Sequence, residues 1–244
     1  MRSTLIVLLA AIALSCTSFA QVPGVAQGNA FEASPGVWHA VLTNKSASSL
    51  VAHYAFFTCG PKSGSSAMPD ARLYSGDRDV SPGENLEITA ADPSQCTGGV
   101  KAAIFSDGHG EGDPHLLAEL YARRRGAYDA LGEAIELLDS IQNEQSIPNV
   151  VDTLTSRRNA IREQKTLAAA GSDYVFSLVL HTLDDSSYNV GLPSDDKGQT
   201  APAVADATNA NGVSREQARL IVLSNRLKAW RLLLEQNLQP PAAQ

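Results

Sequence analysis

The pattern of apolar and polar positions changes near the middle of the chain. Before residue 112, short apolar stretches alternate with turn-forming residues; after it, apolar residues recur at intervals of three and four. Alternation is typical of half-buried strands, and the wider spacing is typical of amphipathic helices. The pattern therefore predicts an α+β protein, with a β-sandwich domain over residues 31–112 and a helical region over residues 113–239.

The strands predicted in the first region are short and separated by turn clusters, as in an antiparallel sandwich. The stretch Leu50 to Cys59 is apolar on both of its faces. Since both faces of such a strand are normally covered, we expect the helical region to pack on the sheet. Strands are predicted at residues 37–43, 50–59, 86–90 and 100–105, with a short strand at 72–74 and a loop over 60–70.

The helical region is predicted to form a hairpin or bundle of three to four helices. The first helix should span residues 114–141, and a second should start at Ile147 and break at Gly171. The apolar run 173–183 is assigned to a helix because its neighbours are helical. Residues 186–213 show little periodicity and are predicted to form a long mobile loop.

The last helix has a recognisable start. Ser214 followed by Gln217 is the spacing of a capping box, in which each residue satisfies a backbone group of the other. The apolar seam that follows shows the spacing of a buried helix face. It consists of Leu220, Leu223, Leu227, Trp230 and Leu234.

The first twenty residues have the features of an export signal. Arg2 precedes an apolar run from Leu5 to Leu14, and Ser18 and Ala20 are small residues at the positions that signal peptidase reads. We expect a signal peptide over residues 1–20, a flexible lead-in over 21–30 and a periplasmic or secreted protein. Lipid attachment at Cys16 is the alternative. No later segment is apolar enough to span a bilayer.

Export decides how the remaining cysteines are interpreted. Once the signal is removed, Cys59 and Cys96 are the two that remain. In an oxidising compartment such a pair is most simply a disulfide. Closing this loop would stabilise the fold by about 3–4 kcal/mol on the chain-entropy model. A metal pair or a catalytic thiol would need histidine or acidic partners at motif spacing, which the sequence lacks.

The charge balance argues against nucleic acid as a partner. The net charge is −7, and residues 1–112 carry six basic and nine acidic side chains. Residues 113–244 carry thirteen basic and seventeen acidic ones. Neither region has the surplus of lysine and arginine that phosphate-backbone binding requires.

Four potential metal ligands alternate with glycines between the two regions: Asp107, His109, Glu111 and Asp113. Calcium loops place ligands at alternate positions, with a glycine sixth and a bidentate glutamate twelfth. Here the twelfth place is Ala118, so the pattern favours a strand-to-helix turn over a calcium site. In that turn Asp113 is the N-cap of the helix, and Pro114 is its first residue.

Two arginines and two histidines have ambiguous positions. Arg124 and Arg158 lie on apolar helix seams. Either they extend outward to solvent, which we favour, or they form a buried layer with carboxylates such as Glu119, Glu133 or Glu136. An anion-binding site is the third alternative. His39 and His53 lie in predicted strands that could be neighbours, but zinc requires three or four ligands.

The nucleophile-elbow, P-loop and dinucleotide-binding motifs are absent from the sequence.

Three short pieces carry a family resemblance: Thr43-Asn44-Lys45-Ser46, Ser81-Pro82-Gly83-Glu84 and Phe105-Ser106-Asp107-Gly108. With the arginine-bearing helix that follows, they resemble uncharacterised exported bacterial proteins that have an immunoglobulin-like sandwich followed by helices. The resemblance covers residues 31–140. It implies a fold and no activity.

Two functional hypotheses follow. The first is a non-enzymatic binding or structural module of the cell envelope, whose partner is an unknown envelope protein or surface component. The second is a hydrolase or metal-dependent enzyme with a site near residues 107–115, built from His109, Glu111 and Asp113. A structural calcium ion at the same loop is a third possibility.

Overall fold

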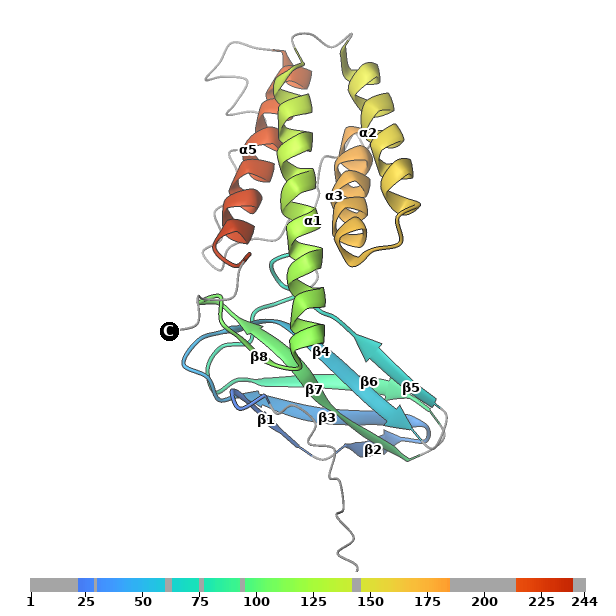
Figure 1. Ribbon diagram of the computed structural model, residues 1–244, viewed down its shortest axis with the longest axis vertical. Helices are drawn as coiled ribbons and strands as arrows, with labels where there is room; N and C mark the ends of the chain where they lie inside the picture. Colours follow the sequence, from blue (N-terminus) through green and yellow to red (C-terminus); the bar gives the residue numbers. More distant parts are fainter. Residues whose placement is uncertain are drawn as a thin grey trace, which may run out of the picture.

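The computed structural model describes residues 22–28, 30–59, 63–74, 77–92, 95–141, 146–184 and 214–238. Within these ranges the protein is α+β, as predicted, with two antiparallel sheets and four helices where three to four were predicted. Figure 1 shows the strands gathered at one end of the molecule and the helices rising from them. The predicted signal peptide, Cys16 and the loop 186–213 lie outside the described residues.

The first sheet is built around β3 (Val37–Asn44), which pairs on one side with β6 (Asn85–Ala91). Its other side pairs with two short strands in succession, β1 (Val25–Gln27) and β2 (Phe31–Ser34). Side chains of β3 alternate strictly between half-buried and buried. This alternation is the expected result of one face being covered and the other open.

The second sheet has the order β5-β4-β7-β8. Of its two central strands, β4 (Leu50–Cys59) has the predicted bounds, and β7 (Cys96–Phe105) ends where predicted but begins at Cys96, before the predicted start at residue 100. The edge strand β8 (Gly110–Gly112) is short. The edge strand β5 (Ser63–Ala67) lies where a loop was predicted, so that prediction was wrong. Its small polar residues have no strong strand preference, and pairing with β4 makes it a strand.

The predicted short strand at residues 72–74 was also wrong. The segment is a tight turn, in which the backbone N–H groups of Leu73 and Tyr74 both donate to the carbonyl of Asp70. Leu73 is fully buried among helix residues. The apolar side chain of Leu73, which led to the strand prediction, is therefore buried by the helices and not by a neighbouring strand.

The two sheets enclose a shared apolar core. Leu42 of the first sheet packs in one cluster with Leu50 and Phe105 of the second. A neighbouring cluster packs Trp38 against Cys59 and Cys96. These cysteines form the predicted disulfide. They are directly opposed residues of β4 and β7, so the bond joins two strands of one sheet.

Four helices are described: α1 (Pro114–Asp139), α2 (Ile147–Arg162), α3 (Leu167–Asp184) and α5 (Arg215–Glu235). The capping box of Ser214 and Gln217 is present, and all five residues of the predicted seam of α5 are buried. The helix break predicted at Gly171 was wrong. The chain instead breaks between Arg162 and Leu167, with Lys165 at a positive φ of 52°.

Gly171 lies inside α3 because that helix approaches α1 closely. A Cβ at Gly171 would lie 2.0 Å from the carbonyl oxygen of Arg123, and a Cβ at Gly126 would lie 1.9 Å from that of Ala168. Neither distance is compatible with a side chain. The two glycines therefore allow the backbones of α1 and α3 to touch, and the cost of glycine in a helix is offset by that contact.

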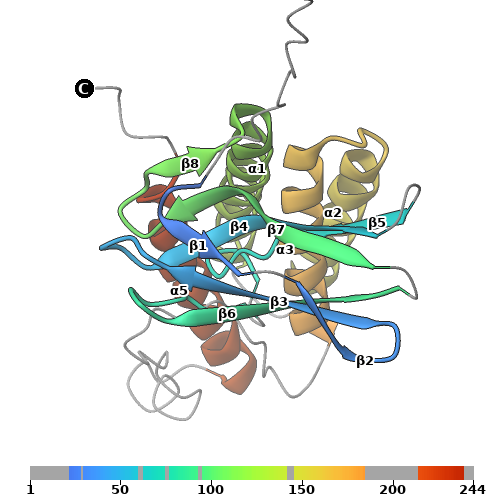
Figure 2. The ribbon, with the colours of Figure 1, turned by 90° about the horizontal axis from the view of Figure 1, so that it is seen from below.

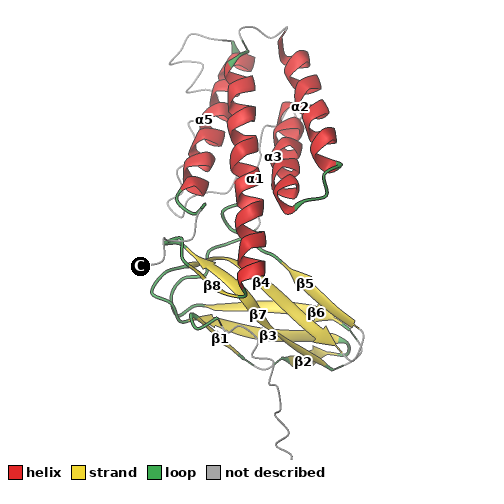
Figure 3. Ribbon diagram, in the orientation of Figure 1, coloured by secondary structure: helices red, strands yellow, loops and turns green. Residues whose placement is uncertain are grey.

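The helices stand on the second sheet and do not cover it. Leu116, Leu117, Leu120 and Tyr121, in the first turns of α1, pack on the face of β4 and β7 that points away from the first sheet. The rest of α1 extends beyond the strands, with α2, α3 and α5 beside it (Figure 3). The view from below also shows the strands at the end of the helical bundle (Figure 2). The expectation that the helical region packs on the sheet is therefore correct for the first turns of α1 alone.

Candidate functional site

Three of the four predicted metal ligands come together in the turn after β7. Asp107 accepts hydrogen bonds from the Ser48 hydroxyl at 2.8 Å and pairs with His109 Nδ1 at 2.5 Å. His109 Nε2 lies 3.5 Å from Glu111 Oε1. The other oxygen of Glu111 accepts the backbone N–H of Gly24 at 2.6 Å. We call this cluster the Asp107 loop. Its hydrogen bond with Gly24 links the residue before β1 to the end of the second sheet.

Hydrogen bonding keeps Asp107 ionised. Burial by itself would raise the pKa of Asp107, but hydrogen bonds from Ser48 and His109 and the charge of His109 hold the pKa below its usual value. The side chain remains half exposed, so solvent weakens these contacts.

Asp113, the fourth predicted ligand, serves the helix. Its carboxylate accepts the backbone N–H of His115 at 2.8 Å and that of Leu116 at 3.3 Å. These are N-terminal amides of α1 that have no partner within the helix. The predicted N-cap is therefore confirmed, with Pro114 in the first turn.

The Asp107 loop does not have the geometry of a hydrolytic triad. In a triad a serine hydroxyl donates to the imidazole, which a carboxylate orients. Here the Ser48 hydroxyl donates to Asp107, and His109 Nε2 is directed to Glu111. Across the described ranges of the chain, no group of three or more His, Cys, Asp or Glu side chains could hold a metal ion.

A buried ion pair lies elsewhere, between the sheets and the helices. Asp70 is 1% exposed and Arg124 is 0% exposed. Arg124 donates to both carboxylate oxygens of Asp70, from Nε at 2.7 Å and from Nη2 at 2.8 Å. Such a two-pronged contact is the strongest form of charge-assisted hydrogen bond. The predicted outward orientation of Arg124 was therefore wrong, and its partner is none of the three glutamates considered.

The surrounding contacts involve residues 68–74 and 77–80. Arg72 donates to Asp79 at 2.6 Å, and its carbonyl accepts the indole N–H of Trp230 at 2.7 Å. Tyr74 packs edge-on against Tyr174, which in turn packs edge-on against Trp230. Arg123 donates to the Tyr74 hydroxyl, and Arg124 donates to the carbonyl of Asn237. We call this set the junction: residues 68–74 and 77–80 with Arg123, Arg124, Tyr174, Trp230 and Asn237. It joins the sheets to α1, α3 and α5.

His53 lies near the junction and is buried in β4 (4% exposed). Desolvation lowers its pKa from 6.5 to about 4, although the charge of Asp70 opposes this shift. The imidazole is therefore neutral at physiological pH. His39 is on the other sheet, stacked on Phe31 and hydrogen-bonded to Glu87. The two histidines do not come together.

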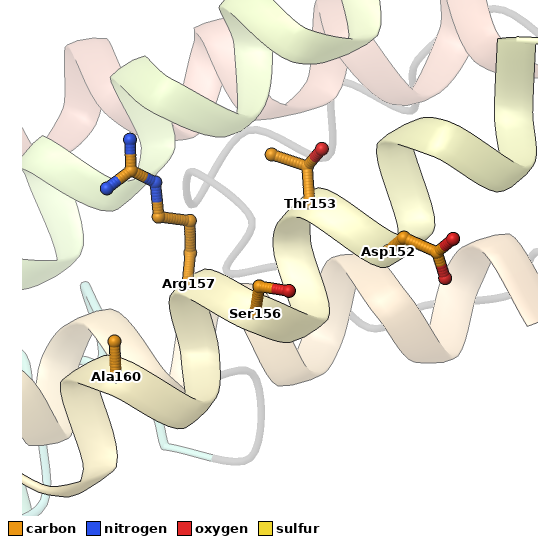
Figure 4. A pocket seen from close by; sticks show the side chains of 5 residues that line it. All are labelled: Asp152, Thr153, Ser156, Arg157 and Ala160. Atoms are coloured by element: carbon orange, nitrogen blue, oxygen red, sulfur yellow. The ribbon is translucent and has the colours of Figure 1, made fainter.

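Two open hollows lie on the helices. The described residues that line one of them all lie on α2: Asp152, Thr153, Ser156, Arg157 and Ala160 (Figure 4). The other lies between α2 and α3 and includes Arg158, His181 and Asp184. Arg158 pairs with Asp173 at 2.8 Å, and both side chains are about 30% exposed. Among the lining residues of either hollow, no nucleophile is hydrogen-bonded to a base.

Comparison with known protein families, curated proteins and solved structures gave no match to this chain. None of the helices in the described ranges is long and apolar enough to cross a membrane. The junction could not have been found from sequence spacing, because Asp70 and Arg124 are fifty-four positions apart. The available signal was an arginine on an apolar helix seam, which indicates a buried partner without identifying it.

Proposed function

We propose that this protein is an exported, non-enzymatic binding or structural module of the cell envelope. The disulfide between Cys59 and Cys96 supports an oxidising compartment. The N-terminal pattern of Arg2, an apolar run and Ser18 to Ala20 supports cleavage after Ala20.

The observation that carries this proposal is the junction. Asp70 and Arg124 are buried and paired although they lie fifty-four positions apart, so their contact holds the helical bundle in a fixed position on the sheets. A buried ion pair of this kind tolerates little relative movement, because separating the partners leaves a charge without solvent. Such a rigid body suits a module that presents surfaces at a fixed distance from each other.

We further propose that the two sheets form an immunoglobulin-like sandwich. In that fold the first, second and fifth strands share one sheet, and the third, sixth and seventh share the other. Counting β1 and β2 together as the first strand, β3 and β6 complete one sheet, and β4, β7 and β8 lie in the other. The remaining strand, β5, pairs with β4 in that second sheet, whereas the fourth strand of a constant-type immunoglobulin domain lies in the first sheet. Unlike the inter-sheet bond of antibody domains, the disulfide here lies within one sheet.

The compartment is tested by isolating the protein from cell fractions and determining its N-terminus and thiol state by mass spectrometry. We expect an N-terminus at Gln21, with Cys59 and Cys96 linked, in the envelope or medium. An intact Met1 in a cytoplasmic fraction with free thiols would exclude export.

The partner is sought by photo-crosslinking in intact cells. A photoreactive residue is placed at Ser156 on α2 or at Asn85 on β6, both exposed. We expect at least one position to give a discrete adduct with another envelope component, identified by mass spectrometry. The same residue in an Asp70→Ala background is the matched control, since loss of the junction should weaken capture. Uncaptured monomer at every position would contradict the binding hypothesis.

A further inference from the structure

β6 is the longest unprotected strand edge among the described residues. It has seven residues in unbroken register with β3, from Val37 opposite Ala91 to Thr43 opposite Asn85. The other border strands are shorter, and β2 is interrupted by a register shift. Proteins normally protect exposed edges with charged side chains (lysine above all), prolines, bulges or covering segments. β6 contains no proline or bulge, and its one charged side chain, Glu87, pairs with His39. Among the described strands β6 pairs with β3 alone.

The backbone of β6 presents every second residue outward. At its two ends, the Asn44 N–H donates to the Glu84 carbonyl, and the Asp92 N–H donates to the Gly36 carbonyl. In an antiparallel ladder these hydrogen-bonded pairs recur at every second residue. Even-numbered residues of β6 therefore bond to β3. The N–H and C=O groups of Asn85, Glu87, Thr89 and Ala91 point away from it, and no other described strand pairs with them.

The side chains of β6 determine what kind of strand fits beside it. Leu86, Ile88 and Ala90 are half-buried and pack against the core between the sheets, whereas Asn85, Glu87, Thr89 and Ala91 are exposed. An added strand would extend that core if it carried apolar residues at alternate positions and polar residues between them. β6 has this pattern itself, so its own sequence is a suitable partner.

We propose that β6 is a self-association edge that pairs antiparallel with β6 of a second copy of this chain. A two-fold axis perpendicular to the sheet keeps the apolar faces of both copies on the same side. Pairing Glu87 with Glu87 would place like charges opposite each other, which destabilises a ladder. The register that pairs all seven residues avoids this, because it places Glu87 opposite Thr89 of the second copy, Ile88 opposite Ile88 and Leu86 opposite the smaller Ala90.

The test is the mass of the purified protein by sedimentation velocity and light scattering over a range of concentrations. We expect a dimer of twice the chain mass. Thr89→Pro removes an N–H that points away from β3, and proline is tolerated at such edge positions. We expect this variant to weaken self-association by about tenfold or more, since the symmetric pair loses a hydrogen bond in each copy. Thr89→Ala keeps the N–H and should remain dimeric.

A second measurement covers the case in which Thr89→Pro does not fold. The Glu87→Cys/Thr89→Cys variant places two cysteines opposite each other across the proposed interface, at a spacing that a disulfide can bridge. Mild oxidation should link it into a dimer on a non-reducing gel, whereas each single variant should remain largely unlinked.

A parent protein that stays monomeric at its highest soluble concentration would overturn the proposal. Equal dimerisation of a folded Thr89→Pro variant would overturn it too. Neither result would affect the proposed envelope role, which depends on the compartment and partner experiments.

Discussion

The junction and the Asp107 loop each pair an aspartate with a nitrogen-bearing side chain, but one pair is buried and the other is exposed to solvent. In the junction, Asp70 and Arg124 are withdrawn from solvent and bind each other through two hydrogen bonds. In the Asp107 loop, Asp107 is half exposed and His109 is 31% exposed. Since water screens charges so effectively, the exposed contacts contribute little to stability, whereas loss of either partner in the junction leaves a buried charge.

The conspicuous motif at residues 107–113 is therefore a poor guide to which residues stabilise the fold. The alternating glycines and charges of residues 107–113 attract attention in the sequence, whereas Asp70 lies in an ordinary turn. The helical bundle nevertheless depends on Asp70 for its buried ionic contact with the sheets. Breaking each cluster in turn would measure the difference.

The largest effect is expected from Asp70→Ala. It leaves the guanidinium of Arg124 buried without its carboxylate, which should lower the free energy of unfolding by about 3–5 kcal/mol. Urea unfolding followed by circular dichroism measures the change. Asp107→Ala, the matched substitution in the exposed loop, should cost less than about 1 kcal/mol. Equal losses from the two variants would contradict the contrast between the clusters.

His53 should make stability depend on pH. The unfolded chain takes up a proton at this residue near pH 6.5, whereas the folded chain does so near pH 4. The unfolded state therefore binds more protons in that window, and stability falls as the pH drops from 6.5 to 4, by about 3 kcal/mol. His53→Leu should remove this part of the dependence in urea titrations at each pH. His115→Gln, at an exposed histidine, is the control; an unchanged slope in His53→Leu would contradict the assignment.

Asp113→Ala tests the cap at the base of α1. Two helix amides lose their acceptor, so we expect a loss of about 1 kcal/mol, measured by thermal or urea unfolding. Asp113→Ser is the matched control, because serine is an equally good N-cap and should retain most of the stability. If both variants lost the same amount, the carboxylate would have a role beyond capping.

The smallest effect is expected from calcium. Asp107, Glu111 and Asp113 already accept hydrogen bonds from Ser48, Gly24 and the first turn of α1. We therefore expect neither added calcium nor a chelator to change the Tm in differential scanning calorimetry. A Tm raised by calcium and lowered by the chelator would instead support the predicted metal site, with magnesium as the control ion.

Local patterns predicted much of the secondary structure. The seam of α5 and its capping box follow from spacing alone, because helix periodicity and N-cap chemistry act over a few residues. The strand β5 was missed because its residues have little preference for any structure and only pairing with β4 makes them a strand. Gly171 was misinterpreted as a break because its reason is the proximity of α1, which is remote in the sequence.

The amino-acid sequence by itself determined the α+β division, the first and last helices, the central strands and the cysteine pair, since these depend on periodicity, capping and residue type. Only the tertiary structure decided which charged residues are buried together as an ion pair. Asp70 and Arg124 are adjacent because a turn after β5 meets α1, and the open edge of β6 exists because no other described strand reaches it. Contacts between distant segments depend on how all the elements pack together, and no local pattern encodes them.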